Sequence, residues 1–154
     1  MSYFVTGGTG FIGRFLIGNL LKRKGTIHVL VRKASLKKFE AMAKKQAWDP
    51  KRVIAVVGDM TAANCGLTAA QVRALTGKVQ HFFHLAAIYD LTASAEEQQA
   101  ANIDGTRHAL DLGAALKVKC FHHASSIAAA GLYPGVFRED MFDEAEGLDD
   151  PYLR

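Results

Sequence analysis

Apolar residues along this chain fall into two kinds of segment. Five short runs are almost continuously apolar, as in "TIHVLVR" (26–32), which is typical of strands covered on both faces. Between them, apolar residues recur at helical spacing, as in the pairs Phe11 and Phe15, and Leu16 and Leu20, each four residues apart, which indicates helices. The predicted strands are 2–6, 26–32, 52–59, 79–87 and 118–126, and the predicted helices are 11–24, 36–47, 68–77 and 94–117.

This alternation of strands and helices predicts an α/β fold with a doubly wound parallel sheet and helices on both faces. End signals support the helix assignments. Ser94 and Glu97 have the spacing of a capping box, and Thr68 and Gly77 fit the start and stop of the third helix. No internal repeat, low-complexity segment or linker interrupts the pattern, so residues 1–154 are predicted to form one domain.

A glycine-rich turn, "TGGTGFIGR" (6–14), joins the first predicted strand to the first helix. Glycine permits the tight turn, lets the backbone approach a pyrophosphate and lets the helix pack on the strand. The helix N-terminus then presents its N–H groups to the phosphates. Because the turn has a strand before it and a helix after it, it predicts a dinucleotide-binding Rossmann domain. The expected contacts are Gly7, Thr9, Gly10, Phe11, Ile12 and Gly13.

The end of the second strand selects between NAD and NADP. An acid there would hydrogen-bond the ribose hydroxyls of NAD, but this chain has Arg32 and Lys33. An arginine can bind the 2′-phosphate of NADP through two parallel hydrogen bonds. The sequence therefore favours NADP over NAD, with Arg32 as an ordinary surface charge the alternative. Arg14 is a second candidate for a phosphate contact.

Composition and charge exclude several other functions. The chain is 49% hydrophobic and 22% charged, and no apolar stretch is long enough to span a bilayer. Residues 1–52 hold twelve Lys or Arg against Glu40 and Asp49, but these bases lie at helix ends and on a helix face without interleaved aromatics, so nucleic-acid binding is not predicted. An acidic segment, 139–150, is predicted to be a loop.

Cysteine and histidine positions predict no metal site. Cys65 and Cys120 lie far apart, as expected for two reduced thiols of a cytoplasmic protein without a signal peptide. The histidines at 81, 84, 122 and 123 fall in two predicted strands. Because adjacent strand residues face opposite sides, these four side chains cannot all converge on one ion.

With these features together, the chain resembles an extended short-chain dehydrogenase/reductase. "GDM" (58–60) resembles the family's Gly-Asp after the third strand, which implies that Asp59, with Met60 beside it, reaches the adenine. "HLAA" (84–87) resembles the small-residue end of the fourth strand, where Ala86 and Ala87 would let the cofactor lie close. "NIDGT" (102–106) resembles the family's Asn-x-x-Gly-Thr, which makes Asn102 the supporting amide of the active site.

The same resemblance implies the catalytic residues. "SSIAAAG" (125–131) places Ser126 where the family's catalytic hydroxyl lies, and Tyr152 follows 26 residues later, where the Tyr-x-x-x-Lys tyrosine is expected. Its lysine would lie two residues beyond Arg154. The chain is therefore expected to be an N-terminal fragment, with its sheet truncated after about five strands and with no catalysis of its own. Ser126 as a strand-end cap and Asn102 as a surface amide are the alternatives.

Within the family, the chain looks most like the N-terminal part of bacterial fatty acyl-CoA reductases, which implies NADPH-dependent reduction of an acyl thioester or aldehyde in lipid metabolism. Ala130 stands where many sugar epimerases of the family have tyrosine. A nucleotide-sugar epimerase or dehydratase and a non-catalytic dinucleotide-binding module remain the alternatives. The expected partner is a small-molecule substrate such as an acyl-CoA, and an open sheet edge would allow chains to pair as a homo-oligomer.

Overall fold

The computed structural model describes residues 2–87 and 92–141. The chain separates into two compact units, one that ends at His123 and one that begins at Ala124. Five parallel strands of the first unit form one sheet, in the order β3-β2-β1-β4-β5. The strands are β1 (Ser2–Thr6), β2 (Thr26–Val31), β3 (Val53–Val57), β4 (Val79–His84) and β5 (Cys120–His123).

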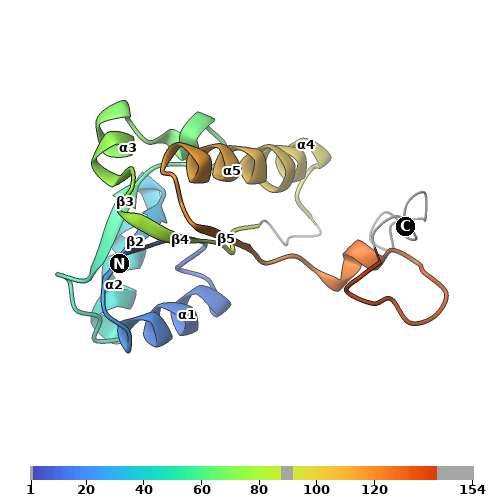
Figure 1. The fold of residues 1–154 in the computed structure, drawn as a ribbon, viewed down its shortest axis with the longest axis horizontal. Coiled ribbons are helices and arrows are strands. Elements are labelled where there is room, and N and C mark those ends of the chain that lie inside the picture. The colour runs from blue at the N-terminus through green and yellow to red at the C-terminus, as the bar shows by residue number, and fades with distance from the viewer. Residues whose placement is uncertain (1, 88–91, 142–154) are drawn as a thin grey trace. The chain divides into compact units, whose positions relative to one another are not determined.

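Helices cover both faces of this sheet. Figure 1 shows α1 and α2 on one side of it and α3, α4 and α5 on the other. Their bounds are α1 (Phe11–Leu21), α2 (Leu36–Lys45), α3 (Ala69–Leu75), α4 (Ala95–Gln98) and α5 (Gly105–Ala115). The predicted doubly wound α/β fold is confirmed. The strand order reverses between β1 and β4, where a crevice for a ligand is expected in such sheets.

Two apolar cores hold the helices to the sheet. On one face, Tyr3 and Val5 of β1 pack with Ile17 of α1 and Phe39 of α2. On the other face, Phe4 of β1 and Phe82 of β4 pack with Leu75 of α3 and Leu112 and Leu116 at the end of α5. Consecutive residues of β1 therefore enter different cores, which is why this strand is apolar at nearly every position.

The predicted single helix over 94–117 is in fact three segments. The capping box of Ser94 and Glu97 starts α4 as predicted, and a π-helical segment, Gln99–Asp104, then separates α4 from α5. The Thr106 hydroxyl, in the first turn of α5, donates to the Asn102 carbonyl oxygen of this segment at 2.6 Å. A Cβ at Gly105 would lie 3.0 Å from the Met60 side chain, so α5 begins in close contact with that residue.

One early basic residue is explained by the fold. The Arg52 guanidinium donates to the carbonyl oxygen of Leu21 at 2.7 Å and to that of Gly25 at 3.1 Å. It also donates to the carbonyl oxygen of Arg23. These carbonyls lie at the end of α1 and just after it, where backbone acceptors have no partner within the helix. Arg52 therefore holds the segment after α1, which ends at Leu21, three residues before the predicted end.

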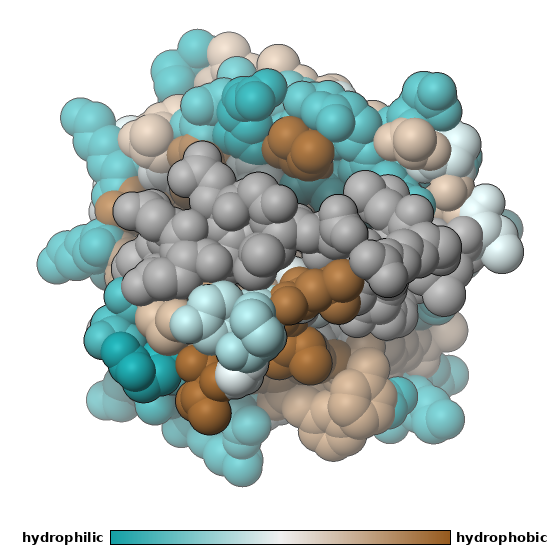
Figure 2. Space-filling model, turned by 90° about the vertical axis from the view of Figure 1, so that its right-hand side faces the viewer, coloured by the Kyte–Doolittle hydropathy of each residue, from teal (hydrophilic) through white to brown (hydrophobic). Residues whose placement is uncertain are grey.

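The described part of the second unit, 124–141, contains one short 3-10 turn, Ile127–Ala130. Several of its apolar side chains are exposed, among them Ile127, Leu132 and Val136. Figure 2 shows hydrophobic side chains at the surface of one side of the molecule, among hydrophilic ones. None of the helices within 2–87 and 92–141 has the length and apolarity that crossing a lipid bilayer requires.

Candidate functional site

A pocket of about 300 Å³ opens at the carboxyl ends of β1 to β4. Each strand contributes the residues at its end, which is where ligands bind in open parallel sheets. Eight residues predicted from the sequence line this pocket: Gly7, Thr9, Gly10, Arg32, Asp59, Met60, Ala86 and Ala87. The topology thus brings together four segments that are far apart in the sequence.

The glycine turn forms one wall of the pocket and allows almost no added atom. A Cβ at Gly7, whose φ is +69°, would lie 2.7 Å from the Ala86 nitrogen. A Cβ at Gly13 would lie 2.3 Å from the Gly7 carbonyl oxygen and 2.6 Å from the Gly8 Cα. The first turn of α1 therefore packs directly on the turn, and the turn packs on the chain after β4.

The N-terminus of α1 begins at this wall. Gly10 is its N-cap, and no side chain caps the N–H groups of the first turn. These groups and the helix dipole favour an anion. The side chains of Phe11 and Ile12 are 70% and 61% exposed and do not line the pocket, and neither does Gly13. Phe11, Ile12 and Gly13 would therefore contact a ligand in the pocket through their backbone atoms. The guanidinium of Arg14 stacks on the Phe11 and Phe15 rings.

Arg32 stands at the end of β2, on the rim of the pocket. Its side chain is exposed and makes no ion pair with any other described residue. A 3-10 turn, Lys33–Ser35, follows at once, and the Ser35 N–H donates to the Arg32 carbonyl oxygen at 2.8 Å. The turn returns Ser35 to the pocket lining. Ser35 was not predicted from the sequence, because it reaches the pocket only through this turn.

Asp59 is held by the loop that follows β3. Its Oδ1 accepts hydrogen bonds from the Thr61 N–H at 3.0 Å and the Thr61 hydroxyl at 2.9 Å. Its own N–H donates to the Cys65 carbonyl oxygen at 2.8 Å, because Asn64, Cys65 and Gly66 all have left-handed φ values and fold the loop back. Next to it, the Met60 carbonyl oxygen lies 2.9 Å from the His108 Nδ1 of α5. Asp59 and Met60 therefore have fixed positions at the pocket.

Asn102 lies in the π-helical segment, next to Ala101, which is buried and lines the pocket. π-Helical turns occur often at functional sites. Sequence reasoning also missed further lining residues, which are neighbours of predicted ones along the chain: Thr6, Leu30, Val31, Gly58, Thr61 and Leu85.

A buried histidine, His84, joins the pocket wall to this segment. Its Nδ1 lies 2.8 Å from the Thr6 hydroxyl, and its Nε2 lies 3.1 Å from the Thr106 hydroxyl. The Thr106 hydroxyl already donates its hydrogen bond to the Asn102 carbonyl oxygen, so it can only accept from His84. The imidazole must therefore donate from Nε2 to Thr106 and accept at Nδ1 from the Thr6 hydroxyl. Burial, and secondarily the charge of His123, lowers the pKa of His84 to about 4. The ring is therefore neutral at pH 7.

The predicted catalytic hydroxyls are not among the residues described at this pocket. Ser126 is exposed and precedes the 3-10 turn of the second unit, which is described by itself. Tyr152 lies outside the described residues. The roles of Ser126, Tyr152 and Asn102 remain predictions.

The two cysteines are expected to differ sharply in reactivity. Cys65 is fully buried, and burial, with Asp59 and Asp111 as further causes, raises its pKa to about 12. Cys120 is partly exposed on β5. Because the thiolate is the reactive form, iodoacetamide should alkylate Cys120 in the native chain and leave Cys65 unmodified until the chain is unfolded. Peptide mass spectrometry reads both sites, and early labelling of Cys65 would contradict this prediction.

Comparison with known proteins decides the family. The family model described as Male sterility protein, NAD_binding_4, matches residues 5–152. The chain belongs to this family of extended short-chain dehydrogenase/reductases. The predicted family is confirmed, and the members of the family that the chain resembles include several reductases.

Relatives of the chain come from much longer proteins. It is 32% identical to one of the polypeptides of the linear gramicidin synthase of Brevibacillus parabrevis, over 97% of this chain and 3% of that protein. It is 29% identical to a Drosophila melanogaster protein provisionally named fatty acyl-CoA reductase CG8303, over 97% of this chain and 30% of that protein. The chain thus spans less than a third of either relative.

Solved structures agree with the fold. The terminal R domain of the myxalamid PKS-NRPS pathway superposes with a TM-score of 0.79 at 28% identity, over 97% of this chain and 40% of that one. Yeast methylglyoxal/isovaleraldehyde reductase Gre2, solved with NADPH, superposes with a TM-score of 0.71 at 20% identity, over 84% of this chain and 38% of that one. The second likeness shows the fold alone.

Proposed function

We propose that the chain is the dinucleotide-binding part of an NADPH-dependent reductase that acts on an acyl thioester or an aldehyde. The observation that carries the cofactor proposal is the pocket itself, in which the glycine turn, Arg32 and Asp59 share one lining. The lack of a Cβ at Gly7 and Gly13 lets the turn pack on the chain after β4 and lets α1 begin directly at the turn, which brings the helix N-terminus to the pocket.

Each part of the pocket would hold a different part of the cofactor. The uncapped first turn of α1 would bind the pyrophosphate, and Asp59 would reach the adenine. Arg32 and Ser35 would bind the 2′-phosphate, since a guanidinium and a hydroxyl both donate to phosphate oxygens and no acid stands at the end of β2. Ala86 and Ala87 would let the cofactor lie against β4.

The bound cofactor would supply the hydride, and the chain's own residues would manage one proton. Tyr152 would donate that proton to the carbonyl oxygen, on which negative charge develops. Ser126 would donate a hydrogen bond to the same oxygen. The Asn102 backbone, fixed by Thr106, would support the site.

The substrate class of this proposal follows from the relatives. A fatty acyl-CoA and the substrate of an aldehyde reductase both offer a carbonyl carbon to hydride, and proteins with both names are among the relatives. An NADPH oxidation assay with a long-chain acyl-CoA, run on a full-length polypeptide that contains these residues, tests this part. Steady oxidation supports the acyl-thioester class, whereas no oxidation together with co-purified NAD would favour the sugar-nucleotide alternative.

Cofactor choice can be tested on the 154-residue chain. We expect it to bind NADPH at least ~10-fold more tightly than NADH, because hydrogen bonds to a charged group contribute ~1.5–3 kcal/mol each. R32A should abolish this preference by weakening NADPH binding alone. K33A is the matched control, since Lys33 is exposed beside Arg32 but does not line the pocket. Fluorescence titration of the reduced nicotinamide measures the affinities of the three proteins for both cofactors, and equal affinities in the unaltered chain would contradict the proposal.

A further inference from the structure

Two histidines and a cysteine meet on one face of the sheet, away from the pocket. In the parallel register of β4 and β5, His81 pairs with Cys120 and Phe83 pairs with His122. Alternation along each strand therefore places His81, Cys120 and His122 on the same face. His84 and His123, which stack at 5.3 Å, are the next pair along the register. The four histidines divide into two groups, and the first group gains a thiol.

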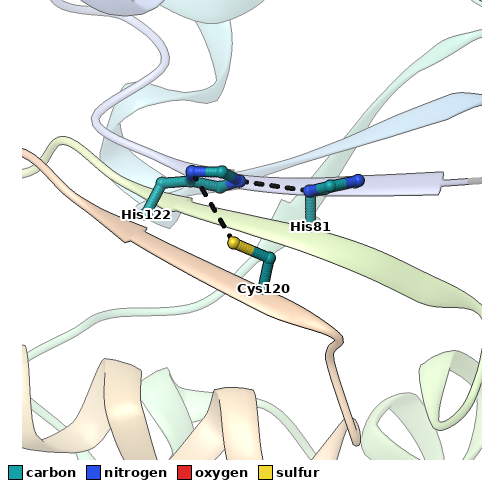
Figure 3. A group of neighbouring side chains, drawn as sticks. All are labelled: His81, Cys120 and His122. Atoms are coloured by element: carbon teal, nitrogen blue, oxygen red, sulfur yellow. Dashed lines mark hydrogen bonds between the residues drawn. The ribbon is translucent and has the colours of Figure 1, made fainter.

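The donor atoms of this first group lie close together. Figure 3 shows that His81 and Cys120 contact different nitrogens of the His122 ring, only one of which would bind an ion. The His81 Nδ1 lies 3.1 Å from the His122 Nε2, and the Cys120 Sγ lies 3.9 Å from the His122 Nδ1. One donor atom from each residue can be chosen so that all three lie within 4.8 Å of one another. Around a tetrahedral zinc ion, ligand atoms lie ~3.3–3.8 Å apart, so the more widely spaced of these donor atoms must move closer together when the ion binds.

Aromatic packing orients both imidazole rings. The His122 ring stacks on Phe83 with centroids 4.3 Å apart and planes 7° apart. The His81 ring stacks on Tyr3 with centroids 5.9 Å apart. All three donor residues are partly exposed, so an ion could reach them from solvent.

We propose that His81, Cys120 and His122 bind a divalent zinc ion that clips the edge strand β5 to β4. Two imidazoles and a thiolate form a donor set that suits zinc better than magnesium or calcium, which require oxygen ligands. Binding releases the thiol proton to solvent, and each imidazole keeps one proton on the nitrogen that does not bind. The fourth position is left to water, and the clip would stabilise a strand of only four residues.

The test uses the 154-residue chain, free of metal and of any histidine tag. We expect one equivalent of zinc to bind, to raise the melting temperature and to slow alkylation of Cys120. Cobalt, used as a probe in place of zinc, should give a thiolate-to-cobalt charge-transfer band. C120S should lose that band, and C120S and H122Q should each weaken zinc binding by at least ~100-fold.

H123Q is the matched control, because His123 is exposed on the same strand beside His122 but outside the donor set. It should keep the cobalt band and the zinc affinity. Circular dichroism confirms that each variant is folded before binding is compared. The proposal is overturned if the unaltered chain gives no cobalt–thiolate band, or if C120S and H122Q bind zinc as tightly as it does. In that case the three side chains form a hydrogen-bonded cluster and no more.

Discussion

G13A is expected to lower the free energy of unfolding by more than ~3 kcal/mol and to abolish dinucleotide binding. The added methyl would lie 2.3 Å from the Gly7 carbonyl oxygen and 2.6 Å from the Gly8 Cα. Both neighbours are backbone atoms of the turn, so no side chain can rotate to make room. The first turn of α1 would have to move away from β1, and the pocket wall would move with it. Urea unfolding followed by circular dichroism measures the loss.

G18A in the same helix is the matched control. Within 4 Å of a Cβ at Gly18 there is nothing, so the added methyl meets open space. Alanine is preferred to glycine inside a helix by ~1 kcal/mol, and G18A should therefore stabilise the chain slightly. Opposite signs for the two substitutions would show that contact with the turn decides the result, since helix propensity is the same in both. Equal effects at the two positions would rule this explanation out.

Local patterns predicted the fold well because the forces that form its elements are local. The β1 prediction matches Ser2–Thr6, and the Thr68 and Ser94 caps are observed with their capping-box partners. Strand ends were predicted less well. The segment 79–87 was predicted as strand throughout, but β4 stops at His84, and Leu85 to Ala87 leave the sheet to line the pocket. An apolar side chain gives the same signal in a sequence pattern whether it lies in a strand or in the loop that follows the strand.

Features that depend on contacts between distant segments could not be predicted. The π-helical segment arises where the Thr106 hydroxyl reaches the Asn102 carbonyl and Gly105 meets Met60 from the loop after β3. The sequence predicted eight of the residues that line the pocket at the four strand ends, because the carboxyl ends of parallel strands meet at one edge. It did not predict Ser35, which a 3-10 turn returns to that edge.

Acid is expected to destabilise the chain through His84. The pKa of this residue is about 4 in the folded chain, against an ordinary value of 6.5. At pH 7 the imidazole is neutral in both states, so the full stability is present. As the pH falls below ~6.5, His84 takes up a proton in the unfolded chain, whereas in the folded chain it does so only near pH ~4. The free energy of unfolding should therefore decrease across this window, by at most ~3 kcal/mol from this residue.

H84Q isolates this contribution. Glutamine does not titrate and cannot serve both Thr6 and Thr106 as the imidazole does, so H84Q should lower the free energy of unfolding at pH 7 by ~1–3 kcal/mol. Its profile should then be flatter between pH ~6.5 and ~4, with a slope smaller by up to ~1.4 kcal/mol per pH unit. The pKa values of His28 and His122 are also lowered, but both residues are present in both proteins and cancel in the difference.

H123Q is the control for this comparison. His123 is exposed and is only the smaller cause of the low pKa of His84, so its removal should leave most of the acid sensitivity in place. Urea unfolding of the three proteins at a series of pH values measures the slopes. If the profile of the unaltered chain ran parallel to that of H84Q, the buried imidazole would take its proton as readily in the folded chain as in the unfolded one. The hydrogen bonds that link Thr6, His84, Thr106 and Asn102 would then form equally well with a charged imidazole.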